Sequence, residues 1–147
     1  MQYTVNAVMQ IAQTRVSEKS QNKEELDTRL LMALRHTRLC TTHSAKFWRM
    51  ISRAHQESFD TQVLMKTVRS IAHHEDKARD IFQDMMKQYP NNVKVLRAYG
   101  RFLVETRNDR EAADGLLSLA ESLEEEESKL HHPSYLSLIH ISQGIVR

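Results

Sequence analysis

The stretch DKARDIFQDMMKQYPNNVKVLRAYGRFLVETRNDREAADGLL, residues 76–117, decides the fold because it interrupts a helical pattern twice. Apolar side chains recur every three or four residues on both sides of Tyr89-Pro90, and again on both sides of Asn108-Asp109. Proline disfavours the helical conformation of the residue before it, and Asn or Asp side chains can cap the free N–H groups that start a helix. The stretch therefore predicts three helices joined by two short connections.

Composition favours helix throughout the chain. The 147 residues include only three glycines and two prolines, too few for a protein of many short strands and turns. A chain of this length can bury a core as a single domain. Its one cysteine, Cys40, excludes an internal disulfide, and no apolar run is long enough to span a membrane. We therefore expect an all-α protein in a reducing, intracellular compartment such as the cytoplasm.

Further helices are predicted before the deciding stretch. Apolar side chains over residues 2–19 follow helical spacing, and the polar segment 20–23 is expected to end that helix. A second helix is expected over residues 27–55, either continuous or bent at the two β-branched residues Thr41 and Thr42. Ser58 or Asp60 is then expected to cap a helix that ends at Tyr89.

The segment after the deciding stretch divides into a helix and a tail. Asp109 is expected to cap a helix over residues 110–130, with Asn91 or Asn92 capping the helix before it. Pro133 breaks the pattern, and residues 131–147 form either one more short helix, from Ser134 to about Ser142, or an apolar strip that waits for a partner. The expected domain is therefore residues 1–130, followed by a tail.

Short connections force neighbouring helices to lie antiparallel, as in arrays of tetratricopeptide (TPR) type. We expect five or six helices, stacked as antiparallel hairpins in a short right-handed array like TPR and half-a-TPR (HAT) repeats. Small residues at close-approach positions support this packing. They are Ala98, Gly100, Ala112, Ala113 and Gly115.

Three ordered motifs carry a resemblance to a known family. They are ARDIFQDMMKQYP, LRAYGRFL and NDREAADGLLSLAESLE, and they resemble the helical-repeat domain of the tiny macrocysts protein B/C family over about residues 26–128. Members are large protist and fungal proteins, many with membrane spans and PAS sensor modules. The resemblance implies a protein-interaction domain without catalytic residues or cofactors. The residues taken as structural are Trp48, Phe82, Tyr89, Pro90, Leu96, Tyr99, Phe102, Asn108, Asp109 and Leu116.

Sequence motifs for an enzyme or a metal site are not found. The pairs His73-His74 and His131-His132 place adjacent rings about 100° apart on a helix, which does not suit one ion. Cys40 has no second cysteine or catalytic neighbour, although His36 four residues earlier would lower its pKa if both faced one cleft. We therefore predict no catalytic, cofactor or metal residues.

Charge is unevenly distributed along the chain. Six Arg or Lys and no acid lie between Arg29 and Ala54, whereas nine acids lie between Glu105 and Glu127. The basic residues fall on one side of a helix, either as a solvated face or as a surface for an acidic protein, a membrane headgroup or RNA. Residues proposed to touch a partner are Arg35, Arg38, Lys46, Arg49, Arg53, Glu124, Glu125, Tyr135 and Leu138.

The predicted function is a non-enzymatic protein–protein interaction module, an adaptor or structural subunit of a larger assembly. Its partners would be other protein subunits or further copies of itself, with nucleic acid less favoured because no aromatic residue alternates with the basic ones. Two alternatives remain: an RNA-associated scaffold of the half-a-TPR kind, which the motifs also resemble, and the cytosolic module of a membrane-bound PAS sensor. Because the resembled family occurs in protists, it suggests a location in a cilium or at the cytosolic face of a membrane.

Overall fold

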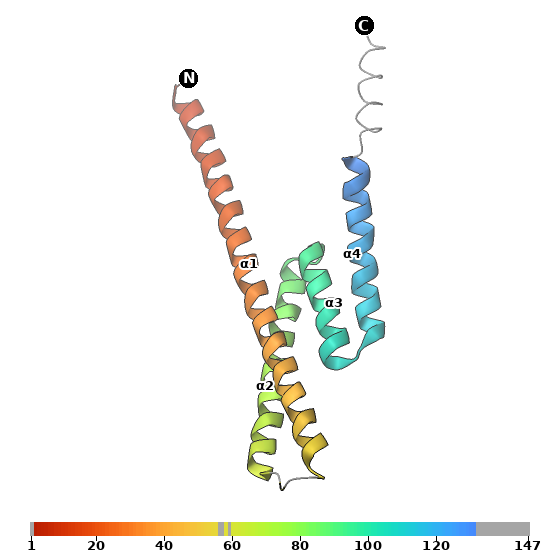
Figure 1. Ribbon diagram of the computed structural model, residues 1–147. Helices are drawn as coiled ribbons and strands as arrows, with labels where there is room; N and C mark the ends of the chain where they lie inside the picture. The colour runs from red at the N-terminus through yellow and green to blue at the C-terminus, as the bar shows by residue number, and fades with distance from the viewer. Residues whose placement is uncertain (1, 56–57, 59, 132–147) are drawn as a thin grey trace. The chain divides into compact units, whose positions relative to one another are not determined.

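The protein is described from a computed structural model that covers residues 2–55, 58 and 60–131. All regular structure in these residues is α-helical, as predicted, and it consists of four helices (Figure 1). The expected number of five or six is wrong, because two of the predicted helices are parts of one. The chain divides between Met85 and Met86 into two compact units, and each is described by itself.

Helix α1, Gln2–Arg53, is 52 residues long and continuous, about 78 Å at the usual rise per residue. The predicted break over residues 20–23 is absent, because polar residues without Gly or Pro leave the backbone free to continue a helix. The suggested bend at Thr41 and Thr42 is also absent. Both hydroxyls donate to the carbonyl oxygen of Arg38, at 2.9 and 2.8 Å, so they bond within the helix.

Helix α2, Thr61–Gln88, turns back along α1 to form the first hairpin (Figure 1). Asp60 caps it, since its Oδ1 accepts from the backbone N–H of Gln62 at 2.8 Å. Two contacts show that the helices run antiparallel. Cys40 Sγ lies 3.7 Å from the carbonyl oxygen of Ile71, and His36, earlier on α1, contacts His74, later on α2. The sequence predicted α2 to end at Tyr89, within one residue of its observed end.

Side chains at alternating spacings of three and four residues line α1 where it faces α2. Ala33 and Cys40 are fully buried, and Leu26 and Thr37 are nearly so. Thr37 bonds its hydroxyl to the carbonyl oxygen of Ala33, which satisfies the polar group inside the helix. On α2 the buried residues follow the same kind of spacing. They are Thr67, Ala78, Phe82 and Met85.

The second unit contains a hairpin of α3, Val93–Arg107, and α4, Arg110–Leu130. Asn92 caps α3 by accepting from Val95 N–H, and Asp109 caps α4 by accepting from Ala112 N–H. Between the helices Asn108 adopts a left-handed conformation with φ of 53°, and its N–H bonds to Leu103. The predicted connection at Asn108-Asp109 is confirmed. Asn108 caps the end of α3, and Asp109 caps the start of α4.

Helices α3 and α4 approach closely at small residues. A Cβ added to Gly100 would lie 3.0 Å from two side-chain atoms of Leu117, whereas Gly115 has open space around it. Ala113 and Ala120 are fully buried on α4, and Leu96 and Phe102 on α3. Gly100 therefore lies at a close approach of α3 to Leu117, whereas Gly115 does not lie at such a contact.

Candidate interaction surfaces

The five cations predicted to bind a partner lie on the exposed outer side of α1. Ala33 and Phe47 face α2. Arg35 comes two positions after Ala33, and Arg49 comes two positions after Phe47, so each points to roughly the opposite side of the helix. The segment from Arg29 to Ala54 holds no acid. We call this surface the basic stripe; it comprises Arg35, Arg38, Lys46, Arg49 and Arg53.

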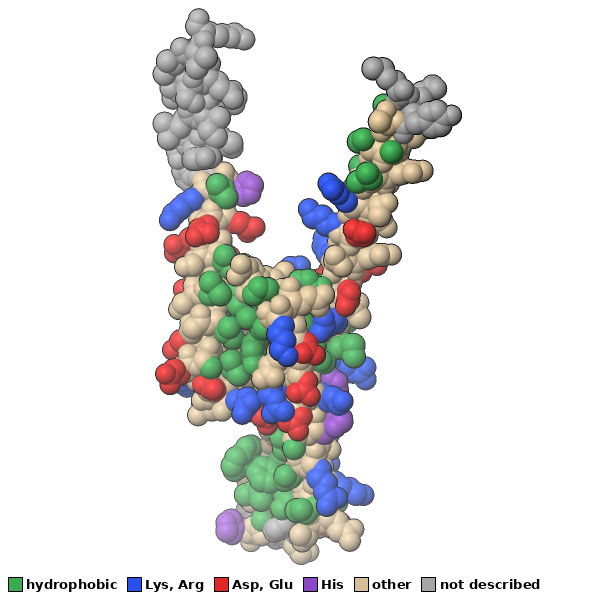
Figure 2. All heavy atoms as spheres, turned by 180° about the vertical axis from the view of Figure 1, so that it is seen from behind, with side chains coloured by type: hydrophobic (Ala, Val, Ile, Leu, Met, Phe, Trp, Pro, Cys, Tyr) green, Lys and Arg blue, Asp and Glu red, His purple; other side chains and the backbone are tan. Residues whose placement is uncertain are grey.

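Trp48 was expected in the core, and the structure places it outside. Its side chain is 64% exposed, whereas the adjacent Phe47 faces the hairpin and is half-buried. The two rings meet edge to face with centroids 5.2 Å apart. Consecutive helical residues point in directions about 100° apart, and here Phe47 is turned towards α2 while Trp48 is turned to solvent. Figure 2 shows hydrophobic side chains gathered at this closed end of the first hairpin.

The acidic residues proposed to meet a partner differ in their surroundings. Glu124 lies on the surface but binds Arg97 of α3, whose Nε donates to its Oε1 at 3.0 Å and whose Nη2 donates to its Oε2. This hydrogen bond from Arg97 lowers the pKa of Glu124. Glu124 therefore ties α4 to α3, whereas Glu125 is exposed. The other two proposed residues, Tyr135 and Leu138, lie outside the described part of the chain.

The residues expected to be structural are mostly internal. Phe82, Leu96 and Phe102 are buried, and Tyr89, Tyr99 and Leu116 are half-buried. The rings of Tyr99 and Phe102 stack with centroids 6.1 Å apart. Pro90, Asn108 and Asp109 lie in the exposed connections that end and start helices.

His36 and His43 of α1 come together with His73 and His74 of α2, a cluster that sequence reasoning missed. His36 and His74 lie 2.9 Å apart between their Nδ1 atoms, and His74 also contacts the rings of His43 and His73. Burial lowers the pKa of both His36 and His74, and positive neighbours lower each further. Antiparallel spacing could have revealed the cluster only after the hairpin register was known.

Metal binding does not fit this geometry. Among the described residues, no group of three or more His, Cys, Asp or Glu side chains is placed to hold an ion. Cys40 is buried, and burial raises the pKa of its thiol, with a smaller contribution from repulsion by Glu75. This direction is opposite to the lowering that His36 would have caused.

No helix in the described part of the chain has the length and apolar character needed to cross a membrane.

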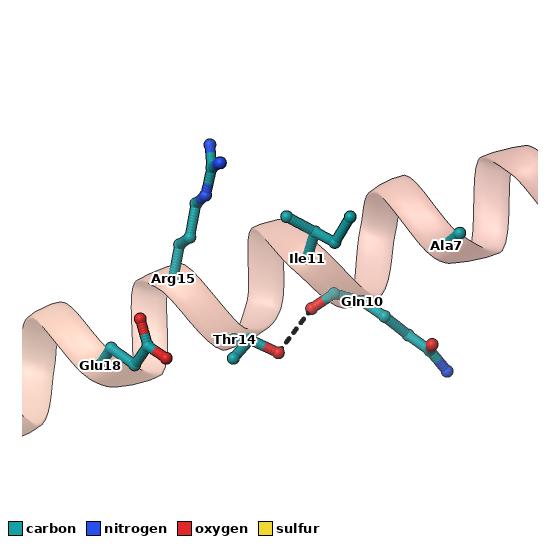
Figure 3. Close-up of a pocket in the computed structure, with 6 residues that line it drawn as sticks. All are labelled: Ala7, Gln10, Ile11, Thr14, Arg15 and Glu18. Carbon is teal, nitrogen blue, oxygen red and sulfur yellow. Dashed lines mark hydrogen bonds between the residues drawn. The ribbon is translucent and has the colours of Figure 1, made fainter.

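A shallow hollow runs along the first turns of α1 (Figure 3). It is lined by side chains of one helix only, and Thr14 bonds its hydroxyl back to the carbonyl oxygen of Gln10 at 2.8 Å. Without a wall from a second element the hollow cannot enclose a small ligand. The lining residues are Ala7, Gln10, Ile11, Thr14, Arg15 and Glu18.

Comparison with known proteins assigns the family. The model of the family described as "TmcB, TPR repeats" matches residues 12–130, more than half of the chain. The chain belongs to the TmcB TPR-repeat family. Tiny macrocysts protein C of Dictyostelium discoideum is 35% identical over 97 residues, and tiny macrocysts protein B of the same organism is 33% identical over 97 residues.

The chain spans a small part of these relatives. Each alignment covers 66% of this chain and 7% of the relative's length. No solved structure matches the chain significantly. The TmcB family assignment fits two antiparallel helical hairpins, and repeats of this type present extended surfaces to other proteins.

Proposed function

We propose that this TmcB-family chain is a non-enzymatic adaptor or structural subunit that binds an acidic protein surface through the basic stripe. The observation that carries this assignment is five exposed cations on the outer side of α1, in a segment without acids. Complementary charge favours encounter and orientation of a partner more than affinity itself. The exposed indole of Trp48, next to Arg49 in sequence, supplies a large apolar contact of the kind that dominates binding energy.

The setting is part of the same proposal. A single buried thiol is compatible with a reducing compartment, so we propose an intracellular location, in the cytoplasm or against the cytosolic face of a membrane. A ciliary location, or a place within a membrane-bound sensor assembly, would follow if the bound partner belongs to one.

Charge reversal tests the assignment. The variant Arg49→Glu/Arg53→Glu should lose most of the partner that the wild-type chain captures from native extract, with recovery followed by quantitative mass spectrometry. The matched control Arg101→Glu/Arg110→Glu makes the same change in net charge on α3 and α4 and should retain the partner. Equal recovery by the two variants would contradict a role for the basic stripe.

An RNA-associated scaffold is the second candidate, and the observation in its favour is the exposed Trp48, next to Arg49 in sequence, because aromatic rings stack on bases. RNA binding predicts an affinity for single-stranded RNA that falls steeply as salt rises. Fluorescence anisotropy at low ionic strength measures it. The absence of binding there would remove this candidate and leave the protein partner.

A further inference from the structure

The first five turns of α1 carry an apolar stripe that nothing in the described part of the chain covers. Every side chain from Thr4 to Glu25 is exposed, including large apolar ones. Val5 and Met9 are each 59% exposed, and Val16 is 70% exposed. Figure 2 shows hydrophobic side chains along this arm. We call this surface the α1 stripe; it comprises Val5, Val8, Met9, Ala12 and Val16.

The α1 stripe continues the surface that packs against α2. Its central residues alternate spacings of four and three, and this alternation persists into the buried half of the helix. Such a repeat keeps one side of a helix facing a neighbouring helix. The full series is Val5, Met9, Ala12, Val16, Lys19, Lys23, Leu26, Leu30, Ala33, Thr37 and Cys40.

Helix α2 stops before it reaches the α1 stripe. The contact of Cys40 with Ile71 sets the hairpin register, which places Met85 opposite Leu26. Gln88, the last residue of α2, therefore lies level with about residue 23 of α1. The preceding residues have the spacing of a helix–helix surface but no second helix from this hairpin beside them. An isolated helix of this length is only marginally stable in water, so packing against another helix would stabilise it.

Charge along the α1 stripe disfavours a highly charged partner and, for two copies of the chain, disfavours one of the two orientations. Between Thr4 and Ser17 the only charged residue is Arg15, so the surface offers no pattern of charges for a highly charged partner. A parallel pair of copies would place Lys19 and Lys23 against their own counterparts, which is unfavourable. An antiparallel pair avoids this contact and places Arg15 opposite Asn6.

We propose that two copies of this chain associate through the α1 stripe, antiparallel, about a two-fold axis between residues 10 and 11. This register sets Val5 of one copy opposite Val16 of the other, and Met9 opposite Ala12. The large Met9 then faces the small Ala12, valine faces valine, and each copy supplies the same surface, as a two-fold interface requires. The contact is about 18 Å long, so it forms a weak dimer rather than an obligate one. It does not involve the basic stripe.

Sedimentation of the full chain tests the dimer. The average mass should rise with concentration from 17.2 kDa towards twice that value. Met9→Glu/Val16→Glu should weaken association at least about tenfold, because it buries like charges. Gln10→Glu/Ser17→Glu adds the same charge at the same spacing, about 100° around α1 from Met9 and Val16 and outside the α1 stripe, and should still associate. A monomer at every concentration, or equal loss with both variants, would overturn the proposal.

Disulfide trapping tests the orientation. Chains carrying Val5→Cys and chains carrying Val16→Cys are mixed, with oxidised glutathione as the oxidant, and mass spectrometry identifies the products. The antiparallel register predicts a disulfide between the two different chains in excess over either symmetric product. Predominance of the symmetric products would overturn it. Arg49→Glu/Arg53→Glu should dimerise like the wild type, so this test and that of the basic stripe can fail independently.

Discussion

The histidine cluster consists of His36, His43, His73 and His74, and the hairpin of α1 and α2 changes the surroundings of each ring by bringing the four together. The ring centroids of His36 and His74 lie 5.2 Å apart, and those of His43 and His74 lie 5.6 Å apart in a parallel stack. Arg35 and Lys77 add positive charge near His36. Neutral rings can share a hydrogen bond in this space, whereas protonated rings would repel one another. The cluster therefore links packing of α1 on α2 to protonation.

Stability of the protein should depend on pH through His36 and His74. Their pKa values are lowered in the folded state, so the unfolded chain binds protons more readily. The free energy of unfolding should therefore be highest above about pH 6.5 and should fall as the pH drops below it, until the folded pKa values are passed. Urea unfolding measured across this range by circular dichroism checks the effect.

Substitution of His74 provides the control for this pH dependence. The variant His74→Gln should show a shallower loss of stability on acidification, because one of the coupled groups is removed. The variant His131→Gln, at the exposed end of α4, should keep the wild-type profile. Equal profiles for all three proteins would show that the cluster does not control stability.

Each connection between helices in the second unit is set by its own side chains. Asn92 and Asp109 satisfy N–H groups at the starts of α3 and α4, and Asn108 supplies the left-handed residue between them. These are local interactions, so they occur at the residues where the sequence predicted them. How closely the resulting helices approach depends instead on residue size at their contact.

Alanine substitution separates helix propensity from packing at the two glycines. Gly115→Ala should raise the free energy of unfolding by about 0.5–1 kcal/mol, because Gly is unfavourable within a helix and the site is open. Gly100→Ala should fail to give this gain and should lower stability by about 1 kcal/mol, since the new Cβ meets Leu117. Chemical denaturation measures both. A gain at Gly100 equal to that at Gly115 would contradict the close packing.

At the scale of the whole molecule, stability and docking reside in different parts of the chain. Burial on α1 begins at Leu26, and both hairpins hold their cores without the residues that precede it. The basic stripe and the α1 stripe both lie on α1. The basic stripe is on the side that faces away from α2, and the α1 stripe precedes the part of α1 that α2 covers. One long helix thus carries two separate surfaces.

Removal of residues 1–22 should leave folding almost unchanged. Exposed positions contribute little to stability, so we expect the free energy of unfolding to change by less than about 1 kcal/mol. The same truncation should abolish self-association, because it removes the α1 stripe. Thermal unfolding and sedimentation of the truncated protein check the two results. A large loss of stability would show that the first turns of α1 support the hairpin.

The sequence by itself determined the all-α class, the family, the helix boundaries near Pro90 and Asn108, and the exposed cations of α1. These follow from local backbone preferences and from spacing along one helix. Only the tertiary structure decided that α1 is continuous, that Trp48 faces outward, that Glu124 binds Arg97, and that four histidines meet. The physical reason is that each outcome depends on which side of a helix its neighbour covers and where that neighbour ends, and one helix's sequence does not contain that information.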